Sequence, residues 1–287
     1  MPYEPFTFSC ADGYPLAASW HIPGQPPRAT VMIAPATGIT QRFYRPFAEY
    51  LAQNGFAVLT FDNRGIGESL HGRLKGHTAS LVDWGRLDMA AALDTLMKRY
   101  PALPCHLIGH SAGAQLVGLM DNAHRLASLF AVGCSSGCLA NMKGWYGLKA
   151  RFFMNVFIPL SNVLSGYAQT DKLGMGGPLP KQVAADWRHW CNGRGYAQTD
   201  FGSRIRQHQY DTLAVPALWL TATDDDIAVA ANVYDMAAVF ARLSPDLVFL
   251  NPADYGLESI GHMKFFSRSS SVALWPLALE WLNRHSG

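Results

Sequence analysis

Charge is scarce in this sequence and almost balanced. Only 15% of the 287 residues are charged, and 23 Lys and Arg against 21 Asp and Glu give a formal net charge of +2. No run of basic residues is longer than two. Proteins that bind nucleic acid concentrate positive charge on one face or along one helix, and nothing in the sequence indicates such a face. We therefore expect no nucleic-acid partner.

Long apolar runs are also missing. The longest segment free of both charged residues and histidine, residues 152–170, is interrupted by polar residues, Pro159 and Gly166, so it is too polar to cross a bilayer. A lid helix or a buried loop fits it better. The first residues, 1–5, lack the basic head and apolar block of a signal peptide. The sequence thus predicts no stable membrane insertion and a cytoplasmic location.

Cysteine is sparse, and the five cysteines form no metal-binding pattern. No pair has the C-x-x-C spacing, and no Cys/His cluster has the spacing of a zinc site. Residues 62–69 could be read as a dinucleotide-binding loop, but Leu70 stands where the third glycine of G-x-G-x-x-G belongs. A structural loop pinned by Asp62 and Arg64 is the better interpretation. The sequence predicts neither a metal nor a cofactor.

Hydrophobic residues make up 49% of the chain, enough for one large core with or without an inserted segment. Short apolar runs alternate with amphipathic segments, which predicts a mostly parallel α/β sheet with helices on both faces. The expected strands are 6–9 and 16–22, paired as an antiparallel hairpin, then 29–33, 56–61, 104–108, 129–132, 216–221 and 247–250. The expected helices are 41–54, 80–99, 228–242 and 272–284.

The alternation breaks between residues 135 and 210, where aromatic residues and glycines are frequent. We interpret 135–210 as a mostly helical cap inserted into a core made of 1–134 and 211–287. Aromatic side chains of the cap either line a pocket for an apolar part of a substrate or pack the core of the cap itself. On the first interpretation, the residues that contact substrate include Trp145, Trp187 and Trp190.

The pentapeptide 109–113, Gly-His-Ser-Ala-Gly, matches G-x-S-x-G and stands between a short apolar run and a segment with helical spacing. A strand that turns at once into a helix strains the residue at the bend, so its neighbours two positions away must be small. Ser111 is then a nucleophile raised from the end of a strand. A second match, residues 133–137, is followed by a poor helix start, and we interpret it as a loop.

Acyl transfer by a serine needs an imidazole that takes its proton and a carboxylate that orients the imidazole. His262 is the histidine that lies in a glycine-flanked loop after the last expected strand. Three consecutive aspartates, 224–226, follow the preceding strand, and we favour Asp225 because its neighbours suit turn and helix-cap positions. The candidates then follow the order nucleophile, acid, histidine along the chain.

The loop 34–39, at the end of the third expected strand, supplies the second N–H of an oxyanion hole in this kind of sheet. We assign that N–H to Thr37, with Ala36 as the alternative. The first N–H is assigned to Ala112, which follows the nucleophile. Around the same site we expect Ala36 and His110 to contact substrate, although His110 has the alternative of packing beside the turn.

Together these stretches resemble an α/β-hydrolase with a cap domain, over nearly the whole chain. The motifs that carry the resemblance are Ala-Pro-Ala-Thr-Gly at 34–38, Asp-Asn-Arg-Gly-Ile-Gly-Glu-Ser at 62–69, Gly-His-Ser-Ala-Gly at 109–113, the aspartates at 224–226 and Gly-His-Met at 261–263. The chain is most similar to a bacterial group of predicted hydrolases related to serine aminopeptidases and lysophospholipases. Many members of that group have His-Gly where this chain has Pro35-Ala36.

The residues and the resemblance together predict a serine hydrolase that forms an acyl-enzyme, most simply a carboxylic-ester hydrolase on a small apolar acyl substrate. An aminopeptidase or amidase is the alternative, but it would need a polar pocket for a free amine, and acids are few in the expected cap (Asp171, Asp186, Asp200). A non-catalytic ligand-binding protein on the same fold is the third hypothesis, which the intact Ser, Asp and His disfavour.

Overall fold

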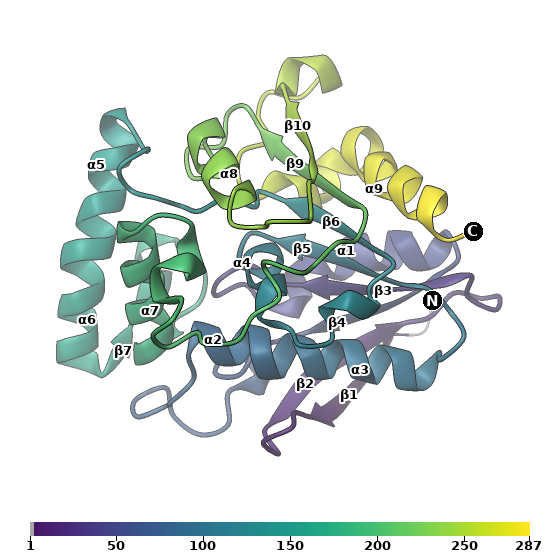
Figure 1. Cartoon of the computed structure of the whole chain (residues 1–287), viewed down its shortest axis with the longest axis horizontal. Coiled ribbons are helices and arrows are strands. Elements are labelled where there is room, and N and C mark those ends of the chain that lie inside the picture. The colour runs from purple at the N-terminus through teal and green to yellow at the C-terminus, as the bar shows by residue number, and fades with distance from the viewer. Residues whose placement is uncertain (1–2) are drawn as a thin grey trace.

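An eight-stranded sheet forms the centre of the protein. The computed structural model describes residues 3–287; Met1 and Pro2, which begin the opening segment considered above, lie outside the described residues. The strands are β1 (Tyr3–Ser9), β2 (Pro15–His21), β3 (Ala29–Ala34), β4 (Phe56–Phe61), β5 (Cys105–His110), β6 (Ser128–Val132), β9 (Ala217–Ala222) and β10 (Asp246–Leu250). They lie in the order β1-β2-β4-β3-β5-β6-β9-β10 (Figure 1). β2 pairs antiparallel with β1 and β4, and all other pairings are parallel, which confirms the expected hairpin and mostly parallel sheet.

Alternate residues of the central strands enter two separate apolar layers, one on each face of the sheet. In β3, Val31 and Ile33 belong to one layer, whereas Met32 and Ala34 belong to the other. The first layer is covered by α1 (Gln41–Gln53) and α9 (Ser271–His285), and the second by α3 (Ala90–Arg99) (Figure 1). Because both faces are covered, these strands are continuously apolar in sequence rather than alternating.

The helix expected over 80–99 is present but not uniform. It begins as α2 (Leu81–Asp83), passes through a π-helical segment (Trp84–Met89) and ends as α3. A capping box fixes its start: the side chain of Ser80 accepts the backbone N–H of Asp83, and the carboxylate of Asp83 accepts the backbone N–H of Ser80. The spacing of apolar residues predicts that a helix is present, but it does not reveal that part of the helix is π-helical.

The helix expected over 228–242 is shorter in the structure, where α8 covers only Ala230–Ala237. After α8 the chain continues in 3₁₀-type turns, as in the bonds from the N–H of Val239 to the carbonyl of Met236 and from Phe240 to Ala237. The predicted helix therefore extended too far toward its C-terminus. The turns after α8 keep the same apolar side chains buried, so their spacing in the sequence looked helical although no α-helix continues there.

Between β6 and β9 the chain leaves the sheet and forms a group of elements on one side of it, at the left of Figure 1. They are α5 (Gly144–Phe152), a π-helical segment (Phe153–Phe157), α6 (Ile158–Ser165), the two-stranded hairpin of β7 (Tyr167–Ala168) and β8 (Leu179–Pro180), and α7 (Lys181–Asn192). The segment is mostly helical, and its small hairpin was not expected. The division into a core and a cap at 135 and 210 stays a prediction.

Charged side chains hold the loop 62–69. The carboxylate of Asp62 accepts the N–H of Gln41 at 2.6 Å, and the guanidinium of Arg64 donates to the buried Asp88 at 2.6 Å. These contacts confirm that the loop is a structural one.

Within residues 3–287, no helix is long and apolar enough to cross a membrane.

Candidate active site

Ser111 occupies the bend between β5 and α4 (Ala112–Gln115). Its backbone has φ 49° and ψ −113°, outside the regions that L-residues ordinarily occupy. A Cβ at Gly109 would lie 2.6 Å from the backbone of α4, and one at Gly113 would lie 2.1 Å from the carbonyl oxygen of Ala34. Only glycine fits at either position, so the local sequence permits the sharp bend that raises Ser111 from the sheet.

Asp225 follows β9, and His262 lies on the loop after β10. Nδ1 of His262 is 2.7 Å from Oδ2 of Asp225, while Oδ1 accepts the N–H groups of Ile227 at 2.8 Å and Ala228 at 2.9 Å. Burial alone would raise the pKa of Asp225, but the imidazole of His262 and the two N–H donors outweigh it and lower that pKa. Asp225 is therefore an ionised carboxylate, and Nε2 is the nitrogen of His262 that remains for a nucleophile.

The neighbouring Asp224 supports the loop that carries the imidazole. Its carboxylate accepts the N–H groups of Ile260 at 3.0 Å and Gly261 at 2.9 Å. Of the three consecutive aspartates, Asp225 alone contacts His262 within the described chain. The sequence could favour Asp225 from the turn pattern, but it held no signal for the supporting contacts of Asp224.

Gly133, the first residue of the second G-x-S-x-G stretch, packs against the same histidine and aspartate. Its φ is 62°, and an added Cβ would lie 2.9 Å from Cε1 of His262 and 3.6 Å from Oδ2 of Asp225. Residues 133–137 form a loop, as predicted, and Ser135 is buried away from the cavity described below. Sequence reasoning missed that this glycine leaves room for the imidazole.

His110 is fully buried beneath the site and links the loops that form it. Its Nε2 lies 2.9 Å from the carbonyl oxygen of His262, which can only accept, so Nε2 carries the proton. Its Nδ1 is then an acceptor and lies 2.8 Å from the hydroxyl of Tyr44. Burial lowers the pKa of His110 to about 3, which keeps the ring neutral. The expectation that His110 contacts substrate is corrected: it does not line the cavity and packs beside the turn.

The Tyr44 hydroxyl also distinguishes between the two candidate oxyanion donors of the loop after β3. It accepts the N–H of Ala36 at 2.9 Å, so that N–H is already occupied. Within residues 3–287, the N–H groups of Thr37 and Ala112 make no hydrogen bond to another protein atom. Ala36, Thr37 and Ser111 all line one cavity. The arrangement favours Thr37 over Ala36 as the second donor.

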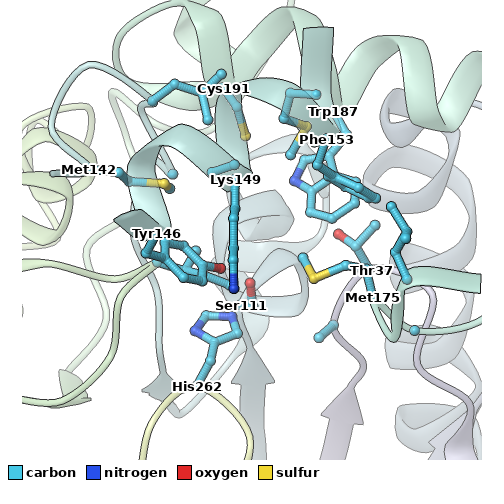
Figure 2. A pocket seen from close by; sticks show the side chains of 18 of the residues that line it. Thr37, Ser111, Met142, Tyr146, Lys149, Phe153, Met175, Trp187, Cys191 and His262 are labelled. Carbon is cyan, nitrogen blue, oxygen red and sulfur yellow. The ribbon is translucent and has the colours of Figure 1, made fainter. Parts of the chain in front are cut away.

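A cavity of about 470 Å³ lies between the segment that follows β6 and the carboxyl ends of the strands, with Ser111 and His262 in its wall (Figure 2). Most of the lining is apolar, including Ile39, Leu139, Met142, Phe152, Phe153, Leu173, Met175, Ile227 and Met263. None of the described residues that line it is Asp or Glu. The volume is typical of small-molecule sites, and the lining suits an acyl chain or another apolar group.

The three tryptophans expected to contact substrate have different environments. Trp187, on α7, lines the cavity (Figure 2). Trp190 is buried in the same helix, where its Nε1 donates to Asp200 at 2.7 Å, and it does not line the cavity. Trp145 is 71% exposed and also lies outside the cavity wall. The expectation that Trp190 contacts substrate is corrected, because Trp190 packs inside the segment 135–210 instead.

Three polar side chains of the cavity wall were not singled out from the sequence, namely those of Tyr146, Lys149 and Tyr196. Tyr196 has φ 54°, which is rare for a residue other than glycine, and its buried hydroxyl lies near the side chain of Thr37 without a hydrogen bond of good geometry. Burial raises the pKa of Tyr196 well above its usual range, so the hydroxyl stays protonated.

The family model described as serine aminopeptidase, S33, matches residues 25–246. The chain belongs to this family. The matched residues include Ser111 and Asp225, and they end before the loop that carries His262. His262 lies outside the match, and its contact with Asp225 is known from the structure of this S33-family chain.

The S33-family chain is 30% identical over 107 residues to a monoglyceride lipase homolog of monkeypox virus, a match that covers 36% of this chain and only 37% of that protein. It is similar to the solved structure of a soluble variant of monoglyceride lipase from Saccharomyces cerevisiae in complex with a substrate analog, with a TM-score of 0.70, 15% identity, and 100% of this chain and 96% of that chain covered. A carboxyl esterase from Bacillus coagulans in complex with glycerol gives a TM-score of 0.66 at 14% identity, with both chains covered fully (100%). At such identities the structures show the fold, which is the α/β-hydrolase fold.

Proposed function

We propose that this protein is a serine hydrolase that cleaves carboxylic esters of small apolar acids through an acyl-enzyme. One observation carries the proposal: Nδ1 of His262 lies 2.7 Å from Oδ2 of Asp225, and His262 shares the cavity wall with Ser111. A serine hydroxyl becomes a nucleophile when an imidazole takes its proton and a carboxylate stabilises the imidazolium that forms. The strained bend at Ser111 supports the same role.

In the proposed reaction, Nε2 of His262 takes the proton of the Ser111 hydroxyl while Oγ attacks the ester carbonyl carbon. The N–H groups of Thr37 and Ala112 donate to the oxyanion of the tetrahedral intermediate. His262 then gives its proton to the alcohol oxygen, the C–O bond breaks, and the acyl group stays on Ser111. A water molecule deprotonated by His262 attacks the acyl-enzyme, and its collapse releases the acid and restores the serine.

The cavity wall supports an ester over an amide substrate. An aminopeptidase must pair the free amino group of its substrate, and none of the described wall residues is a carboxylate. The apolar wall instead matches an acyl chain. Esters of glycerol with one acyl chain belong among the candidates, since two proteins to which this chain is similar are a monoglyceride lipase and a homolog of one.

The test is the hydrolysis of p-nitrophenyl esters of increasing chain length, a monoacylglycerol and a panel of aminoacyl amides. Ser111→Ala should lower kcat on the best ester by about 10⁴-fold or more. Ser135→Ala, in the second G-x-S-x-G stretch, is the matched control and should retain activity, because Ser135 lies outside the cavity wall. A loss of only a few-fold in Ser111→Ala would refute the nucleophile. Faster turnover of amides would favour the aminopeptidase, and no labelling of Ser111 by a fluorophosphonate would favour a non-catalytic binding protein.

A further inference from the structure

The outer face of one long helix carries most of the exposed large apolar side chains of the described residues. α5, the π-helical segment and α6 follow one another without a break over residues 144–165, here called the cap helix, which runs along the left edge of Figure 1. Seven of the twelve exposed large apolar side chains in residues 3–287 belong to it: Trp145, Leu148, Phe152, Val156, Leu160, Val163 and Leu164. We call these seven the cap stripe. Isolated exposed apolar residues are ordinary, but a contiguous set marks an interaction surface.

The spacing of the cap stripe keeps it on one face. Five of its members recur every four residues, from Leu148 to Leu164. Such a series would drift around a regular α-helix, but the π-helical segment at its middle accommodates an extra residue and reduces the drift. The opposite face carries the buried Phe153, Met154 and Ile158. Packing against the protein therefore explains one apolar face of the helix and leaves the cap stripe without an internal partner.

The charged side chains carried by the cap helix itself are all positive. Residues 141–170 contain no Asp or Glu, and their charged residues are Lys143, Lys149 and Arg151. Lys149 Nζ lies 5.6 Å from the centroid of the Trp145 ring. A Trp ring beside a Lys, next to an apolar helix face, is a pattern of helices that lie in the interface of an anionic lipid surface. Two copies of the chain pairing through this face would bring like charges together, which disfavours a self-interface.

The cap stripe is continuous with the cavity. Phe152 is exposed in the stripe and also lines the cavity wall, and the exposed Leu173 lines the same wall. Lys149 and Tyr146 of the cap helix enter the same wall, on the side facing Ser111 and His262 (Figure 2). An acyl chain that leaves a lipid surface at the cap helix would thus meet apolar side chains along its whole way into the cavity.

We propose that the cap stripe binds an anionic phospholipid surface, with the cap helix lying flat in the interface and the cavity opening toward the lipid. The binding itself does not depend on the proposed ester hydrolysis. Only its consequence does: lipid-embedded esters would reach Ser111 without crossing water, so their turnover would depend on the stripe whereas that of short soluble esters would not.

Co-sedimentation with vesicles tests the proposal. The full chain is mixed with vesicles of phosphatidylglycerol and phosphatidylcholine in equal parts, or of phosphatidylcholine alone, at low and high salt. The double variant Val163→Glu/Leu164→Glu changes two residues that are 78% and 75% exposed and lie outside the cavity wall. It should lower vesicle binding roughly tenfold or more. Its melting temperature and its hydrolysis of a short soluble ester should stay unchanged.

The control is Val272→Glu, which places a single added glutamate at a residue that is 90% exposed. Val272 belongs to α9, a helix that Figure 1 shows away from the cap helix. It should bind vesicles as the unchanged protein does, and Ser111→Ala should bind equally well, which separates binding from catalysis. The proposal is overturned if the unchanged protein does not sediment with anionic vesicles, or if the double variant sediments as well as the control. Light scattering in the absence of vesicles that shows a dimer lost in the double variant would overturn it as well, because the stripe would then face a second copy.

Discussion

The hydroxyl of Tyr44 and Nδ1 of His110 lie 2.8 Å apart, buried beneath the candidate active site. Tyr44 also accepts the N–H of Ala36 at 2.9 Å, and His110 donates from Nε2 to the carbonyl of His262 at 2.9 Å. With the proton of His110 on Nε2, all three of these hydrogen bonds have a donor and an acceptor. The loop after β3, the end of β5 and the loop that carries His262 are therefore held together by one chain of hydrogen bonds.

Replacing Tyr44 should disturb this chain without touching the cavity. Tyr44→Phe leaves the N–H of Ala36 and Nδ1 of His110 unpartnered in the interior, which should lower the free energy of unfolding by about 1–3 kcal/mol. The kcat for a short ester should fall on the order of tenfold, with KM nearly unchanged, because Tyr44 does not line the cavity. Urea unfolding and steady-state kinetics measure both effects. Tyr50→Phe, on the same helix, is the control, and a Tyr44→Phe enzyme with full kcat would contradict the coupling.

The aspartates 224 and 225 should respond differently to the same change. Asp225→Asn replaces the carboxylate at 2.7 Å from the imidazole and should lower kcat on the order of 10⁴-fold, since an amide favours the wrong tautomer of His262. Asp224→Asn weakens only the two N–H contacts that support the loop and should cost far less activity. Ester hydrolysis by the two purified variants distinguishes them, and equal losses would argue against the separate roles.

The glycine at 133 should be needed for activity more than for folding. Gly133→Ala forces a Cβ to within 2.9 Å of His262 Cε1, whereas Gly202→Ala places one in open space at a similar φ of 77°. Both variants carry the backbone strain of a positive φ, about 1 kcal/mol in unfolding free energy. Only Gly133→Ala should also lose most of its kcat, because the imidazole must move. Comparable kcat values in the two variants would show that the imidazole tolerates the extra methyl group.

Acid should destabilise the fold through buried histidines, and His106 offers a clear case. Burial lowers the pKa of His106 from 6.5 to about 4, and its ring nitrogens lie 2.9 Å and 3.0 Å from the hydroxyls of Ser128 and Ser286. Between those pH values the unfolded chain binds a proton that the folded chain does not, so stability falls as the pH drops below 6.5. Between pH 7 and pH 5, the unchanged protein should lose on the order of 2 kcal/mol more than His106→Gln.

Urea unfolding at the two pH values measures this difference. The buried acids act in the opposite direction, since burial raises the pKa of Asp62 to about 6 and that of Asp88 to about 7, and folded carboxyls that bind protons gain stability in acid. They are present in both proteins, so they cancel in the comparison. Equal losses in His106→Gln and the unchanged protein would rule out the titration of His106 as a cause.

The amino-acid sequence by itself determined the features that depend on neighbours along the chain. Gly109 permits the bend at Ser111 because a Cβ there would lie 2.6 Å from the backbone of Ala114, five residues along the chain. The alternation of buried apolar runs with amphipathic segments prescribed the parallel sheet, since a strand covered on both faces must be apolar throughout. The turn after β9 already favoured Asp225.

Only the tertiary structure decided the features that depend on packing between distant segments. Asp225 meets His262 across 37 residues and Tyr44 meets His110 across 66, and these contacts determine which carboxylate holds the imidazole and which N–H is left for an oxyanion. The sequence also could not tell which tryptophan faces the cavity. Trp187 and Trp190 lie three positions apart on one helix, yet of these two only Trp187 lines the cavity. Local sterics act within a few bonds and can be read from the chain, whereas the direction of a side chain depends on what the folded protein packs against it.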